Sequence, residues 1–118
     1  MRYEDAKGKV ITLAPKEVKV YSVEITHDRD PIDVAPIVKY FRIPQGEVAP
    51  DVVCEIRQEG RVLKSRPVSN IAFGTTDTKK GELHIVLINN EEEPVDLKLR
   101  VTTGILHKEV EPIEVPTS

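Results

Sequence analysis

The residues best suited to chemistry lie in the stretch THDRDPID, residues 26–33, where one histidine and three aspartates share a short segment. Calcium takes about six to eight oxygen ligands, and closely spaced aspartates can supply several of them. Asp28, Asp30 and Asp33 are therefore candidate metal ligands. The EF-hand pattern is not met, because its glycine and its final glutamate are missing. Asp30-Pro31 also favours a turn, so we expect a solvated turn here, with a cation-binding loop as the alternative.

The three histidines and the single cysteine do not form a motif. His27, His84 and His107 lack the close spacing of a zinc site. His84 shares the face of a predicted strand with two aliphatic residues, so we expect its side chain to be either hydrogen-bonded in the core or half-exposed. Cys54 alternates with Val52 along a predicted strand, so we expect its side chain to face the same way and to be buried as a small hydrophobic group.

The nucleophiles and glycines also lack the arrangements that catalysis needs. Ser22, Ser65 and Ser69 lie outside any G-x-S-x-G elbow, and the chain has no Walker loop or G-x-G-x-x-G. We therefore expect a protein that is not an enzyme, with no catalytic residues, no cofactor and no small-molecule ligand.

An acidic corner, NNEEEP at residues 89–94, separates an apolar run from an alternating one. Asparagine adopts turn conformations readily, glutamates stay solvated, and proline prevents a helix. We expect a turn between two strands, with a site for a cation or a basic partner as the alternative.

Hydrophobic periodicity of two dominates the chain. VDLKLRVTT (95–103) and DVVCEIRQ (51–58) alternate strictly, as half-buried antiparallel strands do. LHIVLIN (83–89) is apolar on both faces, as expected of a central strand covered on both sides. In VKVYSVEIT (18–26) the apolar positions change phase, which predicts a β-bulge or bend near Tyr21. Residues 58–61, QEGR, predict a tight hairpin.

These patterns predict one all-β domain. No stretch shows a convincing 3.6-residue period, and short strands recur at intervals of about 8–12 residues. We expect a single antiparallel β-sandwich of about seven to nine strands over residues 1–118, with immunoglobulin-like or jelly-roll topology. The acidic, proline-spaced tail, residues 111–118, is expected to be extended, as an edge strand or the start of a linker.

Composition argues against several partners. The net charge is −3 and aromatic residues make up only 4% of the chain, which disfavours nucleic acid. No apolar run approaches the ~20 residues of a membrane span, and residues 1–18 lack a signal-peptide core. We expect a soluble, cytoplasmic chain, or a domain excised from an exported protein. Abundant lysine, glutamate and valine indicate a thermophilic source.

The stretch GELHIVLINNEEEPVDLKLRV, Gly81 to Val101, resembles the C-terminal hairpin of GOLD-type and pre-peptidase C-terminal β-sandwich domains. A glycine opens a strand, an asparagine pair ends it, and an alternating strand follows. Eukaryotic GOLD domains usually carry two cysteines, whereas this chain has only Cys54. The resemblance implies a small sandwich that binds protein or carbohydrate and supplies no catalytic residues.

The sequence therefore favours a non-catalytic interaction or structural module. We expect a protein partner or self-association through an edge strand, because adding a strand to a free sheet edge suits this fold. One alternative is a structural subunit of a virion or surface layer, where jelly rolls recur. Another is a calcium-stabilised carbohydrate-binding module, although few aromatic residues are present to stack on sugars.

Overall fold

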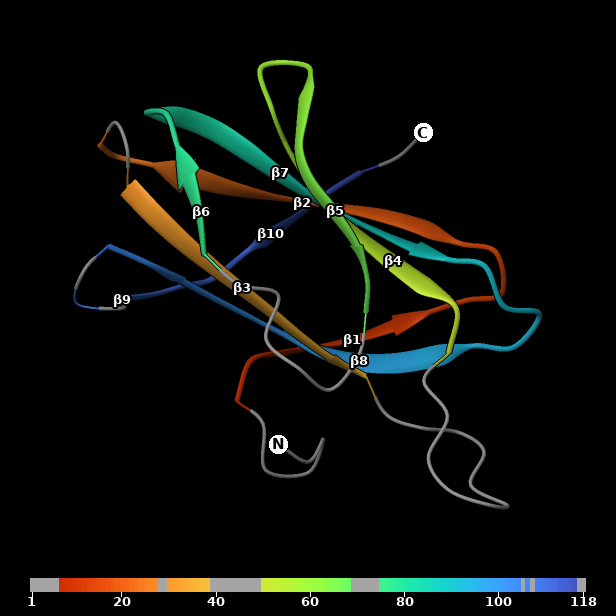
Figure 1. Cartoon of the computed structure of the whole chain (residues 1–118). Helices are drawn as coiled ribbons and strands as arrows, with labels where there is room; N and C mark the ends of the chain where they lie inside the picture. Colours follow the sequence, from red (N-terminus) through yellow and green to blue (C-terminus); the bar gives the residue numbers. More distant parts are fainter. Residues whose placement is uncertain are drawn as a thin grey trace.

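Two antiparallel β-sheets pack against each other and form a β-sandwich (Figure 1). The expected fold class is therefore confirmed, with ten strands and no helix in the part of the chain that is described. No helix in this part is long and apolar enough to cross a membrane. The computed structural model describes residues 7–27, 30–38, 50–68, 75–104, 106 and 108–116.

Each sheet contains five strands. Sheet A consists of β1 (Lys9–Leu13), β8 (Val95–Thr103), β3 (Asp30–Val38) and β6 (Thr75–Thr78) in that order, with β9 (Lys108–Val110) also paired to β8. Sheet B has the order β10 (Ile113–Val115), β2 (Val18–Ile25), β7 (Gly81–Asn89), β4 (Val52–Gln58) and β5 (Arg61–Pro67). The tail predicted to be extended thus contributes an edge strand of sheet B.

The chain alternates between the two sheets, so consecutive strands are seldom partners. Among the described strands, only β4 with β5 and β8 with β9 are both consecutive and paired. The predicted hairpin from Gly81 to Val101 is wrong in this respect. β7 pairs with β2 and β4 in sheet B, whereas β8 lies in sheet A. The acidic corner is therefore an arch that carries the chain from one sheet to the other.

The core lies between the sheets and is filled by alternate residues of their central strands. β7 contributes Leu83, Ile85 and Leu87, and β8 contributes Leu97 and Leu99, all of them fully buried. Burial of a large aliphatic side chain stabilises the fold by about 1.5–3 kcal/mol. The apolar residues that recur at every second position of the sequence are therefore the ones that face the core from both sheets.

The bulge predicted near Tyr21 is absent. β2 pairs with β7 in one continuous register from Val18 to Ile25. Tyr21 and Val23 face the core, while Val18 and Val20 lie on the opposite, outer face of sheet B. The apolar positions change phase because the aliphatic residues lie on the outer face at the start of β2, whereas from Tyr21 onward the apolar residues lie on the inner face.

The tight hairpin predicted at residues 58–61 is confirmed and connects β4 to β5. Glu59 and Gly60 both have positive φ, 54° and 73°, as a two-residue type I′ turn requires. The β4–β5 ladder shifts register between Ile56 and Arg57, so one residue of β5 is extra. The turn projects at the top of Figure 1.

β9 and β1 lie one after the other along the same edge of β8. β9 pairs with Val101–Thr103 and β1 pairs with Val95–Leu99, and both are antiparallel to β8. They therefore run in the same direction, although they come from opposite ends of the chain. Between them, beside Arg100, β9 leaves the sheet and β1 begins.

Candidate functional site

Two of the aspartates proposed as metal ligands, Asp30 and Asp33, lie in β3, so the turn expected at Asp30-Pro31 is wrong and the chain is a strand there, paired with β6. Asp28 lies outside the described residues, and Asp30 pairs with Thr78 through its backbone. Asp33 is half-buried on the outer face of sheet A, where its Oδ1 is buried without a hydrogen-bond partner. Within the described ranges, no three His, Cys, Asp or Glu side chains are grouped to hold a metal ion. A cation-binding loop that includes Asp28 stays a prediction.

The acidic corner is organised around Asn89, a buried amide that is only 1% exposed. Its Nδ2 donates to the carbonyl oxygens of Ala14 and Glu93, each at 3.0 Å, and of Leu13 at 3.3 Å. Its Oδ1 accepts a hydrogen bond from the Glu91 backbone N–H at 2.9 Å. One side chain thus ties the β7–β8 arch to the β1–β2 connection.

Glu91 and Lys16 extend these contacts. A carboxylate oxygen of Glu91 accepts a hydrogen bond from the Asp51 backbone N–H at 2.7 Å. Lys16 Nζ donates to the Asn90 carbonyl at 2.7 Å, and Lys16 has a positive φ of 61°. The turn expected here is confirmed, and these polar groups hold three connections together. The position of an asparagine pair at a strand end was the only sequence signal for this role.

A polar group on the outer face of sheet B contains Ser22, Glu82 and His84. Ser22 Oγ donates to Glu82 Oε2 at 2.8 Å, and His84 Nε2 lies 3.4 Å from Glu82 Oε1. These two contacts, the Ser22 hydrogen bond first, lower the pKa of the exposed Glu82 carboxyl group. The serine contacts the carboxylate and not the imidazole, so the arrangement does not activate a nucleophile.

The remaining chemically reactive residues are dispersed. His27 is exposed just after β2, His84 is half-exposed as expected, and His107 and Ser69 lie outside the described residues. Cys54 is fully buried, as predicted, and burial raises the pKa of its thiol to about 12. A thiol in this state is a poor nucleophile at neutral pH.

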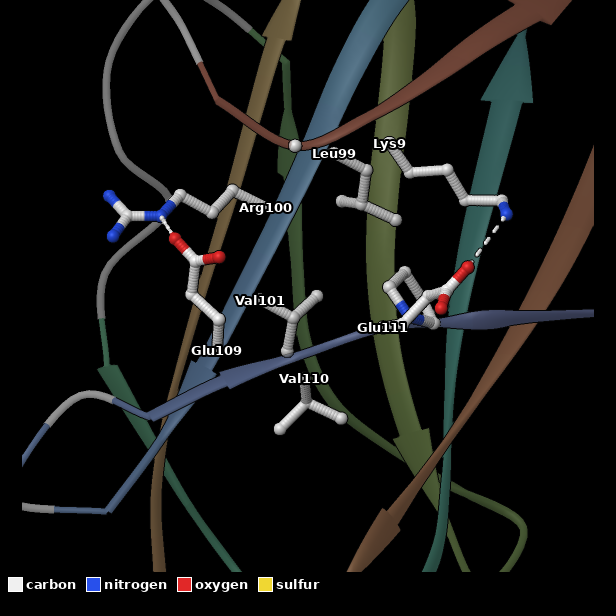
Figure 2. A pocket seen from close by; sticks show the side chains of 9 residues that line it. Lys9, Leu99, Arg100, Val101, Glu109, Val110 and Glu111 are labelled. Carbon is white, nitrogen blue, oxygen red and sulfur yellow. Dashed lines mark hydrogen bonds and ion pairs between the residues drawn. The ribbon is translucent and has the colours of Figure 1, made fainter.

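A groove of about 440 Å³ opens where β9 gives way to β1 along β8. Figure 2 shows Arg100 and Glu109 on one side of it and Lys9 and Glu111 on the other. Arg100 Nε lies 3.0 Å from Glu109 Oε1, and Lys9 Nζ lies 3.7 Å from Glu111 Oε1. The ionic groups of the groove are therefore paired with each other, and exposed pairs of this kind stabilise weakly.

Gly8 allows β1 to enter the sheet at this groove. A Cβ atom at Gly8 would lie 2.6 Å from the Leu99 carbonyl oxygen, and its φ of 139° is one that L-residues rarely adopt. A glycine is thus required where the two strands meet. The groove depends on strands from the two ends of the chain, which no local sequence pattern reveals.

β5 is a largely exposed strand that ends one side of sheet B. Six of its seven residues are exposed, and β4 is its partner in the described part of the chain. It carries Arg61, Lys64 and Arg66 and no acidic residue. Val62 and Leu63 add exposed aliphatic surface.

No protein-family model, no curated protein and no solved structure matches the chain.

Proposed function

We propose that the protein is a non-catalytic interaction module that binds an acidic, extended segment of a partner protein along β5. The observation that carries this proposal is the edge strand β5, which carries basic and no acidic residues and pairs with β4 alone within the described residues. An edge strand offers backbone N–H and C=O groups to an incoming strand, and its side chains select the partner.

The charges of β5 favour a different chain over a second β5. Two copies of β5 would place Arg61, Lys64 and Arg66 opposite one another, and like charges in cross-strand positions are destabilising. The register shift opposite β4 and the terminal Pro67 also limit unselective pairing. A strand that alternates glutamate with aliphatic residues would neutralise the basic side chains and cover Val62.

Two further observations support a role without chemistry. The Cys54 thiol is buried, and Ser22 is hydrogen-bonded to a carboxylate. The resemblance of residues 81–101 to GOLD-type domains favours the same class of role, although β7 and β8 form an arch and not a hairpin.

The proposal is tested with two synthetic heptapeptides that alternate valine with either glutamate or lysine. We expect the glutamate peptide alone to shift the backbone amide resonances of β5, and this binding to weaken as salt is added. Arg61→Glu/Arg66→Glu should abolish the shifts. Lys7→Glu/Lys9→Glu, which makes the same change of net charge near β1, should preserve them. Equal binding of both peptides, or binding that survives the β5 charge reversal, would contradict the proposal.

A further inference from the structure

The outer face of sheet B carries a continuous apolar surface. The register of its strands places Val53, Ile88 and Val18 in one row across β4, β7 and β2. The next row contains Glu55, Val86, Val20 and Val115, so a carboxylate borders the aliphatic residues on β4, and Ile113 of β10 lies beyond Ser22 at the edge. These six side chains, Val18, Val20, Val53, Val86, Ile88 and Ile113, are called the sheet B patch below.

Burial within the sheet B patch increases toward its centre. Ile113 is 58% exposed and Val18 is 43% exposed, whereas Val86 is only 3% exposed. The solvent face of an antiparallel sheet usually carries polar residues. All described strands belong to the two sheets, so no third layer of strands covers this patch in the described part of the chain. A contiguous apolar surface of this kind marks an interaction site.

We propose that the sheet B patch is the interface of a homodimer, in which sheet B of a second copy packs face to face on it. The strands of sheet B contain 34 residues, and at about 4.8 Å between strands and about 3.4 Å along them these form a face of roughly 550 Å². Two such faces bury about 1,100 Å², above the roughly 1,000 Å² that a biological interface should exceed. The area of the face therefore suits a second copy.

The charges that flank the sheet B patch also match a second copy. A two-fold axis parallel to β7 lays β4 of one copy over β2 of the other, so that Val53 faces Val18. Arg57, His84 and Ser22 lie in one row across β4, β7 and β2, so Arg57 of one copy faces Ser22 of the other. Glu24 lies two residues from Ser22 on the same face, within a side-chain length of Arg57. Glu24 is exposed and makes no ion pair within the described residues. Within one chain Arg57 pairs with Glu55, so in the dimer its guanidinium would lie between Glu55 and Glu24 of the other copy.

The first experiment measures the mass of the full chain by sedimentation as its concentration is raised to about 1 mM. We expect twice the 13.3 kDa of a single chain. Ile88→Lys and the more exposed Val18→Lys should each raise the dimer dissociation constant by about 100-fold, because each buries an unpaired charge. Val10→Lys, at a position that is 64% exposed on sheet A, is the matched control and should leave the dimer intact. Far-ultraviolet circular dichroism confirms that each variant is folded.

A charge exchange tests the orientation of the two copies. Arg57→Glu and Glu24→Arg should each weaken the dimer, and the double variant should restore it, because positions 57 and 24 meet only between copies, whereas the Arg57–Glu55 pair lost in both Arg57 variants lies within one chain. A wild-type mass that stays at 13.3 kDa up to about 1 mM overturns the proposal. So does an assembly that survives Ile88→Lys and Val18→Lys but is lost in the β5 charge reversal Arg61→Glu/Arg66→Glu. The homodimer leaves β5 free, so it stands or fails independently of peptide binding at that edge.

Discussion

β7 and β8 are consecutive central strands of the two sheets, and their inner and outer rows differ in a revealing way. Both inner rows are aliphatic and fully buried, with Leu87 and Leu97 as examples. The outer row of β8 is polar throughout, from Asp96 to Thr102. The outer row of β7 begins with Glu82 and His84 and ends with Val86 and Ile88.

The difference shows that two strands with equal roles in the core can differ in what they present outward. The polar outer row of β8 makes contacts such as the Arg100–Glu109 ion pair and the hydrogen bond that Asp96 accepts from Thr12. The aliphatic half of the β7 outer row has no such partner. Hydrophobic residues on an outer face contribute most when they are covered, since burial stabilises by about 25 cal/mol per Å².

The largest expected effects concern the inner rows. Leu87→Ala and Leu97→Ala should each lower the free energy of unfolding by about 2–5 kcal/mol, because each leaves a cavity in the core. Chemical denaturation at low protein concentration measures both values. A cost below about 1 kcal/mol in only one of them would show that the two inner rows are not equivalent.

The arch that connects β7 and β8 is expected to have the next largest effect. Asn89→Ala removes the side-chain hydrogen bonds to Leu13, Ala14 and Glu93 and leaves buried polar groups unpaired, at a cost of about 2–3 kcal/mol. Asn90→Ala is the control, since that side chain is exposed, and should change stability by no more than about 0.5 kcal/mol. Equal stabilities of the two variants would contradict the role assigned to Asn89.

The inner row of sheet B can also be probed by pH through Cys54. Its pKa rises from 9.0 to about 12 in the folded state, so the unfolded chain loses the thiol proton first as pH rises. The resulting stability is complete below pH 9.0 and is lost between pH 9.0 and about 12. From about pH 8 to about pH 10, unfolding by urea should show a loss of about 1.4 kcal/mol that Cys54→Ala lacks.

Tyr21 limits the upper end of this measurement, because burial, and then Glu114 and Glu17, raise its pKa from 10.0 to about 12. Identical pH profiles for the wild type and Cys54→Ala would show that the thiol ionises as easily in the folded chain as in the unfolded one. In that case water reaches the inner face of sheet B around Cys54 more readily than the burial of its side chains indicates.

A smaller effect than that of the arch is expected from the two outer rows. Val86→Ala should cost about 1.6 kcal/mol, because it removes two buried methyl groups at about 0.8 kcal/mol each. Lys98→Ala at the corresponding position of β8 should change the free energy of unfolding by no more than about 0.5 kcal/mol. Thermal melts of dilute protein compare the two. Equal losses in the free energy of unfolding would show that the outer rows of β7 and β8 contribute alike to stability.

The smallest expected effect is that of a chelator. If the acidic corner and the aspartate segment bind no calcium, a chelator should leave the melting temperature unchanged. An ion at a hundredfold excess over its dissociation constant would stabilise by about 2.7 kcal/mol, a shift of several degrees. A chelator-sensitive melt that disappears in Asp28→Asn/Asp30→Asn would establish the cation-binding loop. The same loss in Glu91→Gln/Glu92→Gln would assign a site to the corner.

Local periodicity predicted several of the strands and the fold class, although β3 begins at Asp30, inside the segment expected to be a turn. The alternation of residues 95–103 identified β8, because one face of that strand is buried and the other is solvated. The turn at Glu59-Gly60 was predictable because a type I′ turn requires positive φ at both central residues. Cys54 was correctly placed in the core from the alternation of its neighbours.

Pairing between strands was not predictable, because it depends on contacts distant in sequence. The run from Gly81 to Val101 gives the same pattern for a hairpin and for an arch. The change of phase at Tyr21 was interpreted as a bulge, since the local pattern does not show that Val18 and Val20 pair with the outer apolar residues of the run 83–89. The groove beside Arg100 requires the register of β1 and β9 on β8, which no local signal contains.

The shared edge of β8 also constrains the order in which the protein can be assembled during synthesis. β1 leaves the ribosome early, yet Lys9 pairs with Leu99, which follows 90 residues later. At about 5–20 residues per second, the strand waits roughly 5–18 s for its partner. During that interval Ile11 and Leu13, both buried in the finished sandwich, have no core to enter. A nascent chain halted before Val95 should therefore keep β1 accessible to proteases and to chaperones that recognise unpaired aliphatic strands.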